Sequence, residues 1–599
     1  MDNGIDYEAL GVDRRQIRLV RLPPAPAADS PLDCALETFT RRTCPDYVAL
    51  SYTWGSEAST RPITINDKAC RVSPTVDQAL REICRRGDVS YLWVDQICIN
   101  QRDNEEKNEQ VLQMRHIYSD AHSVIAWLGP SFDGCEALFK HLRRMGNGVK
   151  NRNWDALEML HDDEEHLREV RRAYDALCRR SYWKRLWILQ EFAIASDVSV
   201  MCGSAVLPYT LLLAVQESAD RVSEEIGKRQ TPGRDLLLER LFDNYASPSR
   251  SFMDSVITRR SRFRAQGYEG WEGDLFFQVL TTCLVLERDY NIPQTSDPRD
   301  RVFSLLYLAA DVDEIKDIVD YSKTCAEVYR DTALALLNQG NVDVLAYSQF
   351  PKEIEGLPTW APDWCMPVKN PCNQGPWSSK FSASGNSDEK QEVHEISRGR
   401  LSIKGFSVDT VKKYGNVWDP DWEEPLDRDA ALAFIDDIKE LCKQSPRVRA
   451  NEELLDAVRV ATSDGAQYGE EDVSGQLIAN YIAEFIWAYD RLVLVNPIGE
   501  DGNPQEDQPP SDDDWLVRAI HYLHSRRPFL TSTGFVGLGP SHMEEGDEVC
   551  IFYGGKTPYM IRPEKDGEGY SLVGETFLYG VMHGEALKGE VNSKTYILQ

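Results

Sequence analysis

The sequence predicts an α/β fold: a doubly wound parallel sheet near the N-terminus, then a helical middle region and a β-rich C-terminal module. Three observations predict it. Short apolar segments alternate with amphipathic helical patterns over the first third of the chain, which is the order of a parallel sheet. Long helical patterns dominate the middle. Short β-like runs separated by glycine-containing turns fill the last part.

Length and composition set the scale of this fold. The chain has 599 residues, of which 42% are hydrophobic, so it can form several packed cores and exceeds the size of one ordinary domain. We expect four parts: an N-terminal strand and loop (1–45), an α/β domain (46–230), a mainly helical region (231–398) and a mixed α/β to β-rich C-terminal region (399–599).

Charge and cysteine usage limit the partners and the compartment. The 67 Lys and Arg residues against 97 Asp and Glu give a net charge of −30, which disfavours nucleic acid and anionic membrane surfaces as partners. The 14 cysteines are scattered without a C-x-x-C pair, which indicates a reducing compartment. With no signal-like start and no long apolar run, the sequence predicts a cytoplasmic protein without a membrane span.

The first elements are predicted from local patterns. Gln16 to Leu22 alternates apolar and basic residues before prolines, which predicts an edge strand. Tyr47 to Tyr52 is predicted as a buried strand, Pro74 to Arg85 as a helix and Ser90 to Asn100 as a second buried strand.

The next elements complete the predicted sheet. Asp103 can cap a helix, and Ser123 to Leu128 reads as a third buried strand. A charged insertion, Phe132 to Glu169, precedes a single helix from Trp183 to Glu191, and Val198 to Cys202 is the fourth strand. The resulting order β-α-β-α-β-α-β predicts the doubly wound sheet.

Beyond this sheet the patterns become longer. Tyr209 to Ile226 and Trp271 to Leu286 are predicted helices. The polar stretch Met366 to Ser397 is predicted as a loop, and the acidic, proline-bearing stretch Gly499 to Asp514 as a solvated linker. Arg527 to Gly584 predicts the small β-rich module.

Three long phrases carry a family resemblance. They are YVALSYTWG (Tyr47 to Gly55), the run from Leu92 to Pro130, and RSYWKRLWILQE (Arg180 to Glu191). Together they resemble the heterokaryon incompatibility (HET) domain of filamentous fungi, and later phrases such as DPRDRVFSLL and LPTWAPDW resemble the segments C-terminal to that domain in larger relatives. The resemblance implies a role in self/non-self recognition and regulated cell death.

The order of elements is also similar to the Toll/interleukin receptor (TIR) domain, whose last helix carries W-x-x-x-E. Trp187 and Glu191 match that motif. The resemblance implies that Glu191 cleaves the nicotinamide glycosidic bond of NAD, which is a substrate here and not a cofactor. A fixed carboxylate can stabilise the positive charge that develops on the ribose. Alternatively, Glu191 is a solvated helix residue or forms an ion pair with Arg185 or Lys184.

The remaining candidate residues lie after the first two predicted strands, where an open α/β sheet places its ligand loops. Trp54 could stack on a ring of the nucleotide or could close the edge of the sheet, while Asp95 could bind a ribose diol or position a loop. Asn100 could contact the ligand or cap the next helix, and Trp187 is better suited to a pocket wall than to chemistry. The substrate-binding candidates are Tyr52, Thr53, Trp54, Gly55, Asp95, Gln96, Asn100, Gln101 and Trp187. No metal-ligand spacing is found.

Two function classes remain open from the sequence. The first is an NAD glycohydrolase that produces linear or cyclic ADP-ribose. The second is a non-enzymatic death or signalling adaptor that acts by self-association, in which Glu191 supports a helix. For either class we expect a homo-oligomer and a protein trigger or allelic partner. The W-x-x-x-E helix favours the enzyme, whereas the length of the 132–169 insertion disfavours it.

Overall fold

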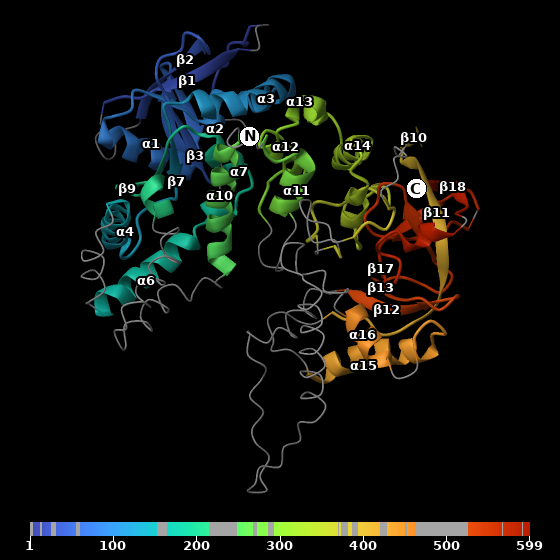
Figure 1. Cartoon of the computed structure of the whole chain (residues 1–599). Coiled ribbons are helices and arrows are strands. Elements are labelled where there is room, and N and C mark those ends of the chain that lie inside the picture. Colours follow the sequence, from blue (N-terminus) through green and yellow to red (C-terminus); the bar gives the residue numbers. More distant parts are fainter. Residues whose placement is uncertain are drawn as a thin grey trace, which may run out of the picture. The chain divides into compact units, whose positions relative to one another are not determined.

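The computed structural model describes two compact units, shown in Figure 1. The first comprises Met1–Phe276 with Tyr290–Ser322, and the second comprises Phe277–Asp289 with Lys323–Gln599. The four-part division expected from the sequence stays a prediction. The described residues are 4–11, 15–24, 32–54, 60–151, 164–214, 248–266, 272–284, 293–368, 371–372, 381–385, 393–419, 428–449, 452–461, 525–565, 567–589 and 591–599.

The first unit contains a nine-stranded mixed sheet of order β5-β4-β2-β1-β6-β3-β7-β8-β9. The neighbouring strands β6, β3, β7 and β8 run parallel to one another. They are the second, first, third and fourth of the four strands predicted from the sequence, in their order across the sheet. The predicted parallel sheet is therefore correct for these four strands and wrong for the whole, because β1 is antiparallel to β6 and β9 to β8. The strands are β1 Gln16–Arg21, β2 Leu32–Thr40, β3 Val48–Tyr52, β4 Arg61–Ile65, β5 Lys68–Val72, β6 Tyr91–Trp93, β7 Ser123–Trp127, β8 Val198–Cys202 and β9 Ala205–Pro208.

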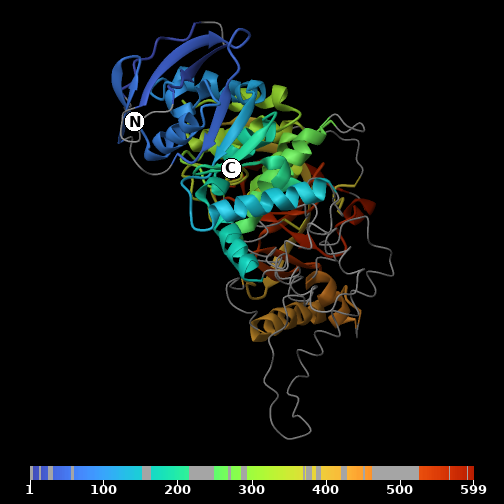
Figure 2. The ribbon, with the colours of Figure 1, turned by 90° about the vertical axis from the view of Figure 1, so that its left-hand side faces the viewer.

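In the first unit, helices α4 and α6 lie near β9 and far from β1 and β2 (Figures 1 and 2). Every residue of β3 is buried, as expected for a central parallel strand covered on both faces. The helices are α1 Pro74–Arg86, α2 Asp95–Cys98, α3 Asn104–Asp120, α4 Cys135–Lys150, α6 Glu164–Cys178, η1 Ser181–Lys184, α7 Trp187–Ile194, α10 Pro248–Ala265, α12 Asp300–Leu306, α13 Val312–Ile315 and η3 Lys316–Ile318; α11 Phe276–Leu284 begins at the boundary of the units.

Local capping explains where two of these helices begin. The Ser73 hydroxyl accepts a hydrogen bond from the backbone N–H of Val76 at the start of α1, with Pro74 in the first turn. Asp103 accepts from the backbone N–H groups of Glu105 and Glu106, which confirms it as the cap of α3. Both helix starts were therefore readable from short-range sequence signals.

The prediction of an edge strand at the N-terminus is wrong. β1 lies between β2 and β6 inside the sheet. Its Arg18 is buried, and its guanidinium binds the Glu106 carboxylate of α3 at 2.6 and 3.0 Å and the Cys98 carbonyl oxygen at 3.1 Å. The basic residue that suggested an exposed strand is neutralised by a partner far along the chain.

Two further elements differ from the prediction. The second strand ends at Trp93, and Asp95–Cys98 forms one helical turn, α2, because polar Asp95 and Gln96 interrupt the apolar run. The helix predicted from Trp183 to Glu191 is divided into η1 and α7, with Arg185 extended between them. This break turns the side chain of Arg185 toward the end of β3.

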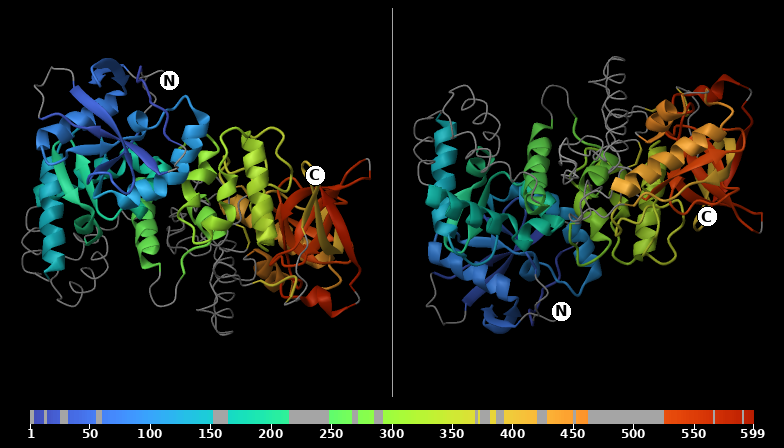
Figure 3. Two further views of the ribbon diagram at one scale, coloured as in Figure 1. Left: turned by 90° about the horizontal axis from the view of Figure 1, so that it is seen from above. Right: turned by 90° about the horizontal axis from the view of Figure 1, so that it is seen from below.

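The second unit ends in a barrel-like β module (Figure 3). The 15-residue strand β11 pairs with β18 through Leu401–Phe406 and with β14 through Gly405–Thr410, so β11, β14, β15, β16 and β18 close on themselves. β12, β13 and β17 continue from β11, and β10 pairs with β11. The strands are β10 His394–Ser397, β11 Arg400–Tyr414, β12 Arg526–Thr531, β13 Val536–Pro540, β14 Glu548–Phe552, β15 Tyr559–Pro563, β16 Tyr570–Glu575, β17 Phe577–Leu578 and β18 Ser593–Leu598.

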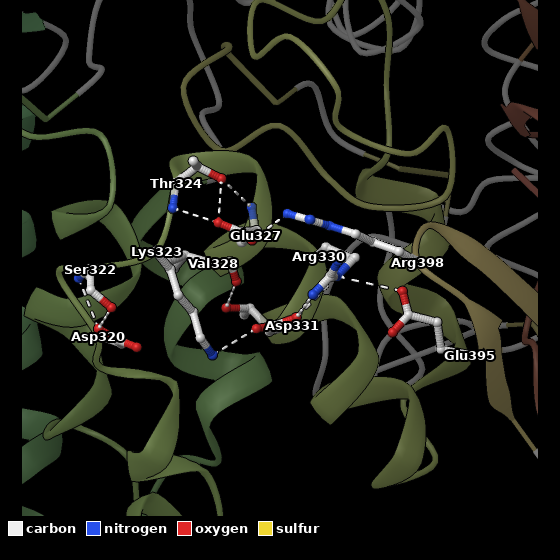
Figure 4. Close-up of polar contacts among 11 residues, drawn as sticks. Asp320, Ser322, Lys323, Thr324, Glu327, Val328, Arg330, Asp331, Glu395 and Arg398 are labelled. Atoms are coloured by element: carbon white, nitrogen blue, oxygen red, sulfur yellow. Dashed lines mark hydrogen bonds and ion pairs between the residues drawn. The ribbon is translucent and has the colours of Figure 1, made fainter.

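Helices of the second unit are α14 Cys325–Asn338, η4 Val342–Tyr347, α15 Arg428–Gln444, α16 Glu453–Ala461 and η7 Glu585–Lys588. α15 and α16 pack with β12 and β13 around a buried core. Thr324 and Glu327 form a capping box at the start of α14, and the charged groups beside it pair with one another: Lys323 and Arg330 with Asp331, and Arg330 with Glu395 (Figure 4). This polar surface stabilises the helix start and is solvated on one side.

Some sequence predictions fall on residues that the structure does not describe. The linker Gly499–Asp514 lies entirely outside the described residues, as do parts of Tyr209–Ile226, Trp271–Leu286 and Phe132–Glu169. The described part of the last segment includes α4 and the start of α6. In the described part of the chain, no helix is both long enough and apolar enough to cross a membrane.

Candidate functional site

Polar side chains from four elements of the first unit meet at the C-terminal end of β3. Because β3, β6, β7 and β8 are parallel, their carboxyl ends lie at one edge of the sheet, where open α/β sheets bind ligands. β3 contributes two residues, the start of α2 one, and the η1–α7 segment three. We call them the buried acid cluster: Ser51, Tyr52, Asp95, Tyr182, Arg185 and Glu191.

Glu191 is almost completely buried in this cluster, with 1% of the residue exposed. The Ser51 hydroxyl donates a hydrogen bond to its Oε2 atom, and the Ser51 and Tyr182 hydroxyl oxygens are 2.8 Å apart. Burial raises the pKa of Glu191 from 4.5 to about 7, while the positive charge of Arg185 and the Ser51 hydrogen bond oppose the rise. Glu191 therefore exchanges its proton near neutral pH.

Asp95 forms the second acid of the cluster and is only partly buried. Its carboxylate accepts hydrogen bonds from the Tyr52 hydroxyl at 2.7 Å and from the Trp54 indole N–H at 2.6 Å. Burial raises the pKa of Asp95, and the charge of Arg185 and these donors counteract the rise. Asp95 and Trp54 thus form the solvent-facing side of the cluster, with Glu191 behind them.

Arg185 connects the two acids. Its guanidinium donates a hydrogen bond to the Tyr52 carbonyl oxygen and lies 6.0 Å from the centre of the Tyr52 ring. Burial acts to lower the pKa of Arg185, but the negative charges of Glu191 and Asp95 raise it above its ordinary value. One fixed cation therefore balances two carboxyl groups, one of which is half protonated near pH 7.

Two segments from later in the chain hold the helix that carries Glu191. Arg260 of α10 donates to the carbonyl oxygens of Phe192 and Ala195 at 2.6 and 2.7 Å, which satisfies the C-terminal end of α7. At the other end, the backbone of Gln294 bonds to the Lys184 carbonyl oxygen and the Leu186 N–H at 2.5 and 3.2 Å.

Trp187 belongs to this second contact. Its indole bonds to Asp300 of α12, which also accepts a hydrogen bond from the Tyr321 hydroxyl at 2.5 Å. Lys107 of α3 lies 3.9 Å from the centre of the Tyr321 ring. The segment 293–322 therefore joins α3 to α7, although it begins about one hundred residues after Glu191.

The structure brings together five of the predicted site residues: Tyr52, Trp54, Asp95 and Glu191 by side-chain contacts or charge, and Gln101 through a hydrogen bond to the Asp95 carbonyl oxygen at 3.1 Å. Thr53 is the residue after Tyr52 and is partly buried.

Three predicted residues make other contacts, and one is not described. The Gln96 side chain accepts from the Ser73 N–H at 3.0 Å, and Asn100 accepts from the Arg102 N–H at 3.2 Å, so both organise loops. Trp187 contacts Asp300 of α12. Gly55 lies outside the described residues.

Sequence reasoning missed Ser51, Tyr182 and Arg260. Ser51 was the one small polar residue in the apolar run Tyr47–Tyr52, and that position in a buried strand is a signal that it needs a partner. Nothing local marks Tyr182 or Arg260. Gln190, beside Glu191 in α7, is also fully buried, and its amide oxygen and nitrogen have no hydrogen-bond partner among the described residues.

This arrangement suits acid–base chemistry or the stabilisation of a cation, since it holds two carboxyl groups whose pKa values burial raises, that of Glu191 to about 7. Among the described residues, no group of three or more His, Cys, Asp or Glu side chains is placed to hold a metal ion.

Comparison with known proteins agrees with this architecture. Residues 47–191 match the family model "Heterokaryon incompatibility protein (HET)", and residues 511–598 match the "Het-6 beta-barrel domain". The chain is therefore a HET-domain protein, as the sequence resemblance predicted.

One curated relative matches along almost the whole chain. In an alignment of 674 positions, gaps included, the chain is 27% identical to "Heterokaryon incompatibility protein 6, OR allele" of Neurospora crassa. The alignment covers 97% of this chain and 95% of the relative. The relationship thus includes the helical middle as well as the two matched domains. No solved structure matches the chain.

Proposed function

We propose that this protein acts in heterokaryon incompatibility, the fungal non-self response, and that its HET domain hydrolyses the nicotinamide glycosidic bond of NAD through Glu191. The observation that carries the enzymatic part is the placement of Glu191: a buried carboxyl group with a pKa of about 7, beside Asp95 and Arg185, at the carboxyl edge of the parallel strands. The parallel order second-first-third-fourth supports a TIR-like core.

The proposed chemistry depends on the positive charge that develops on the ribose when the glycosidic bond breaks. Departure of neutral nicotinamide leaves positive charge on the ribose, and ionised Glu191 stabilises that charge in a site of low dielectric constant. Water then adds to C1 of the ribose and loses a proton, which the Glu191 carboxylate accepts. Ser51 orients the Glu191 carboxylate by its hydrogen bond, and Asp95 lies where it can accept hydrogen bonds from ribose hydroxyls.

Substrate access in this proposal requires movement. Glu191 is 1% exposed, whereas Trp54 and Asp95 are partly exposed. The ribose therefore enters from the Trp54 side, and the Trp54–Asp95 hydrogen bond opens when the nucleotide binds. We propose that self-association, prompted by a protein trigger or allelic partner in the cytoplasm, stabilises this open form.

One observation favours the second candidate function, a non-enzymatic adaptor. A carboxyl group that is 1% exposed and bonded to Ser51, whose hydroxyl also contacts Tyr182, can serve to fix α7 against β3 without touching any ligand. In that case the domain transmits a state by self-association, and Glu191 matters for folding alone.

The two candidates are separated in cells. The full chain, its Glu191→Gln variant and a control variant at exposed Glu105, Glu105→Gln, are expressed at equal levels from an inducible promoter, and NAD content and viability are followed together. For the enzyme we expect NAD to fall before viability in the wild type and the control, and neither to fall with Glu191→Gln. Death at constant NAD in the wild type and the control supports the adaptor, whether or not Glu191→Gln retains it.

A further inference from the structure

Two cysteines that are 67 residues apart in the sequence, Cys135 and Cys202, meet at the same edge of the sheet as the buried acid cluster. Cys135 is the first residue of α4, and Cys202 is the last residue of β8. The Cys135 thiol donates to the Cys202 carbonyl oxygen at 3.8 Å, and the two thiols also bond to each other. Both are free thiols in this structure.

Both thiols are buried, with Cys135 1% and Cys202 0% exposed, but they share one feature of reactive thiols, a cationic neighbour. The Arg180 guanidinium lies 3.8 Å from the Cys202 sulfur and donates to the Pro130 carbonyl oxygen at 2.8 Å. The hydrogen bond from Cys202 is the largest of several effects that lower the pKa of Cys135, and the charge of Arg180 contributes. The same bond, together with burial, raises the pKa of Cys202, so the thiolate of the pair is on Cys135. A helix N-terminus and a nearby guanidinium both stabilise a thiolate.

The backbone around the pair is tightly fixed. Gly203 adopts a positive φ of 55°, its N–H bonds to the Gly129 carbonyl oxygen at 2.9 Å, and a Cβ atom there would lie 2.8 Å from the Ser131 Cβ atom. The segment after β7 is thereby held against the β8–β9 turn. The loop 130–134, mostly exposed, contacts both thiols through Pro130 and Phe132 and separates them from solvent, so an oxidant reaches Cys135 only when this loop moves aside.

We propose that Cys135 and Cys202 are a redox modification site that forms a reversible disulfide with a low-molecular-weight disulfide such as glutathione disulfide as the oxidant. The Cys135 thiolate attacks one sulfur of the oxidant, forms a mixed disulfide and releases one glutathione thiolate. In the mixed disulfide Cys135 no longer carries the charge that raises the pKa of Cys202, so Cys202 loses its proton and its thiolate attacks the Cys135 sulfur, which forms the protein disulfide and releases the second glutathione. Two protein protons are lost, and the oxidant gains both electrons.

The disulfide would join α4 to the end of β8 beside the buried acid cluster. The loop 130–134 comes after β7, which neighbours β3 in the sheet. A covalent link here restricts that edge of the domain, so the oxidised protein has a more rigid HET domain. This inference does not depend on whether the domain hydrolyses NAD.

The chain offers an internal comparison. Cys325 and Cys365 of the second unit also share a thiol hydrogen bond, and that bond and burial raise the pKa of Cys325 as they raise the pKa of Cys202. The two pairs differ in the neighbouring charge, which is the negative Asp363 at Cys325 and the positive Arg180 at Cys202. A negative charge disfavours the thiolate that starts the exchange. We therefore expect the Cys135–Cys202 pair to oxidise first.

The test uses the reduced full chain in glutathione buffers of stepped oxidising ratio, with differential alkylation and peptide mapping. We expect a cross-linked peptide containing Cys135 and Cys202 and a loss of two hydrogen masses, reversed by dithiol reductant. The link should vanish in Cys135→Ser and persist in Cys325→Ser. Replacing Arg180 by Gln should slow its formation roughly tenfold by lowering the thiolate fraction, whereas the exposed neighbour variant Arg179→Gln should not.

Two results would overturn the proposal without any variant. One is recovery of Cys135 and Cys202 as separate alkylated thiols at the most oxidising ratio. The other is a stable glutathione adduct on Cys135 that never resolves to the protein disulfide. Equal rates for Arg180→Gln and Arg179→Gln would refute the part assigned to the guanidinium.

Discussion

The Ser51 hydroxyl of β3 donates a hydrogen bond to the Glu191 carboxylate of α7, across 140 residues of sequence. This contact ties the central strand of the sheet to the helix that carries the candidate catalytic group. It also lowers the pKa of Glu191 against the larger effect of burial. The protonation state of Glu191 therefore depends on burial, on the charge of Arg185 and on this hydroxyl.

Replacing Ser51 by Ala should raise the pKa of Glu191 above about 7, because the hydrogen bond to the ionised form is lost. The carboxyl stretching band of protonated Glu191, assigned by difference with Glu191→Gln, reports the pKa in an infrared pH titration. The control is Ser181→Ala, at an exposed serine of η1. If Ser51→Ala leaves the titration unchanged, the hydroxyl does not bond to Glu191 in solution.

Glu191 should make the domain less stable as pH rises. Its pKa is 4.5 ordinarily and about 7 in the folded protein, so the folded state binds more protons between these values. Glu191 therefore contributes its full share to the free energy of unfolding below pH 4.5, at most about 3 kcal/mol. This contribution decreases as the pH rises and is nearly lost at about pH 7.

Hydrogen exchange of α7 amides in the full chain measures this dependence. Protection factors, corrected for intrinsic exchange, should decline from about pH 5 to about pH 7.5 in the wild type and in Glu105→Gln, and should stay level in Glu191→Gln. A decline of equal size in all three proteins would assign the pH dependence to another group.

The buried ion pair of Arg18 and Glu106 should stabilise the fold only when both partners are present. Removing one partner leaves an uncompensated charge, so Arg18→Met or Glu106→Leu alone should cost about 3–5 kcal/mol, and the double variant should cost less than the sum. Denaturant unfolding of the wild type, the two single variants and the double variant gives the four free energies of a double-mutant cycle. Additive losses would mean that the two side chains do not interact.

The HET domain should need the segment 293–322 for its fold. Gln294 and Asp300 hold the η1–α7 backbone and Trp187, so the piece 1–322 should unfold cooperatively while the piece 1–230 should not. Calorimetry of the two pieces measures this. Asp300→Asn in 1–322 should lower the midpoint, because the charged acceptor of Trp187 and Tyr321 is lost. A cooperative transition of 1–230 at the same midpoint would contradict the prediction.

Much of the first unit was predictable because its signals are local. The apolar runs indicated β3, β7 and β8, and Asp103 marked the start of α3. The DQIC stretch was misread as strand because Ile97 and Ile99 continue the apolar alternation, whereas the backbone N–H groups of Ile97 and Cys98 both bond to the Val94 carbonyl oxygen and close a helical turn.

The rest depended on contacts between distant residues. Arg18 suggested an edge strand because its partner, Glu106, lies 88 residues away. The mixed character of the sheet was missed because β1 was misplaced and the antiparallel strand β9 was not predicted. In the candidate site, the W-x-x-x-E spacing pointed to Glu191, but Trp187 and Glu191 make separate contacts, with Asp300 and with Ser51. Helical spacing alone does not show which partner each face meets.

The central claim is tested most directly by NAD turnover with purified full-length protein, free and clustered on beads, with products separated by chromatography. Wild type and Glu105→Gln should release nicotinamide and an ADP-ribose product, and Glu191→Gln, shown by hydrogen exchange to be folded, should release neither. Absence of nicotinamide from clustered wild type, or equal release by folded Glu191→Gln, would contradict the assignment of NAD hydrolysis to Glu191.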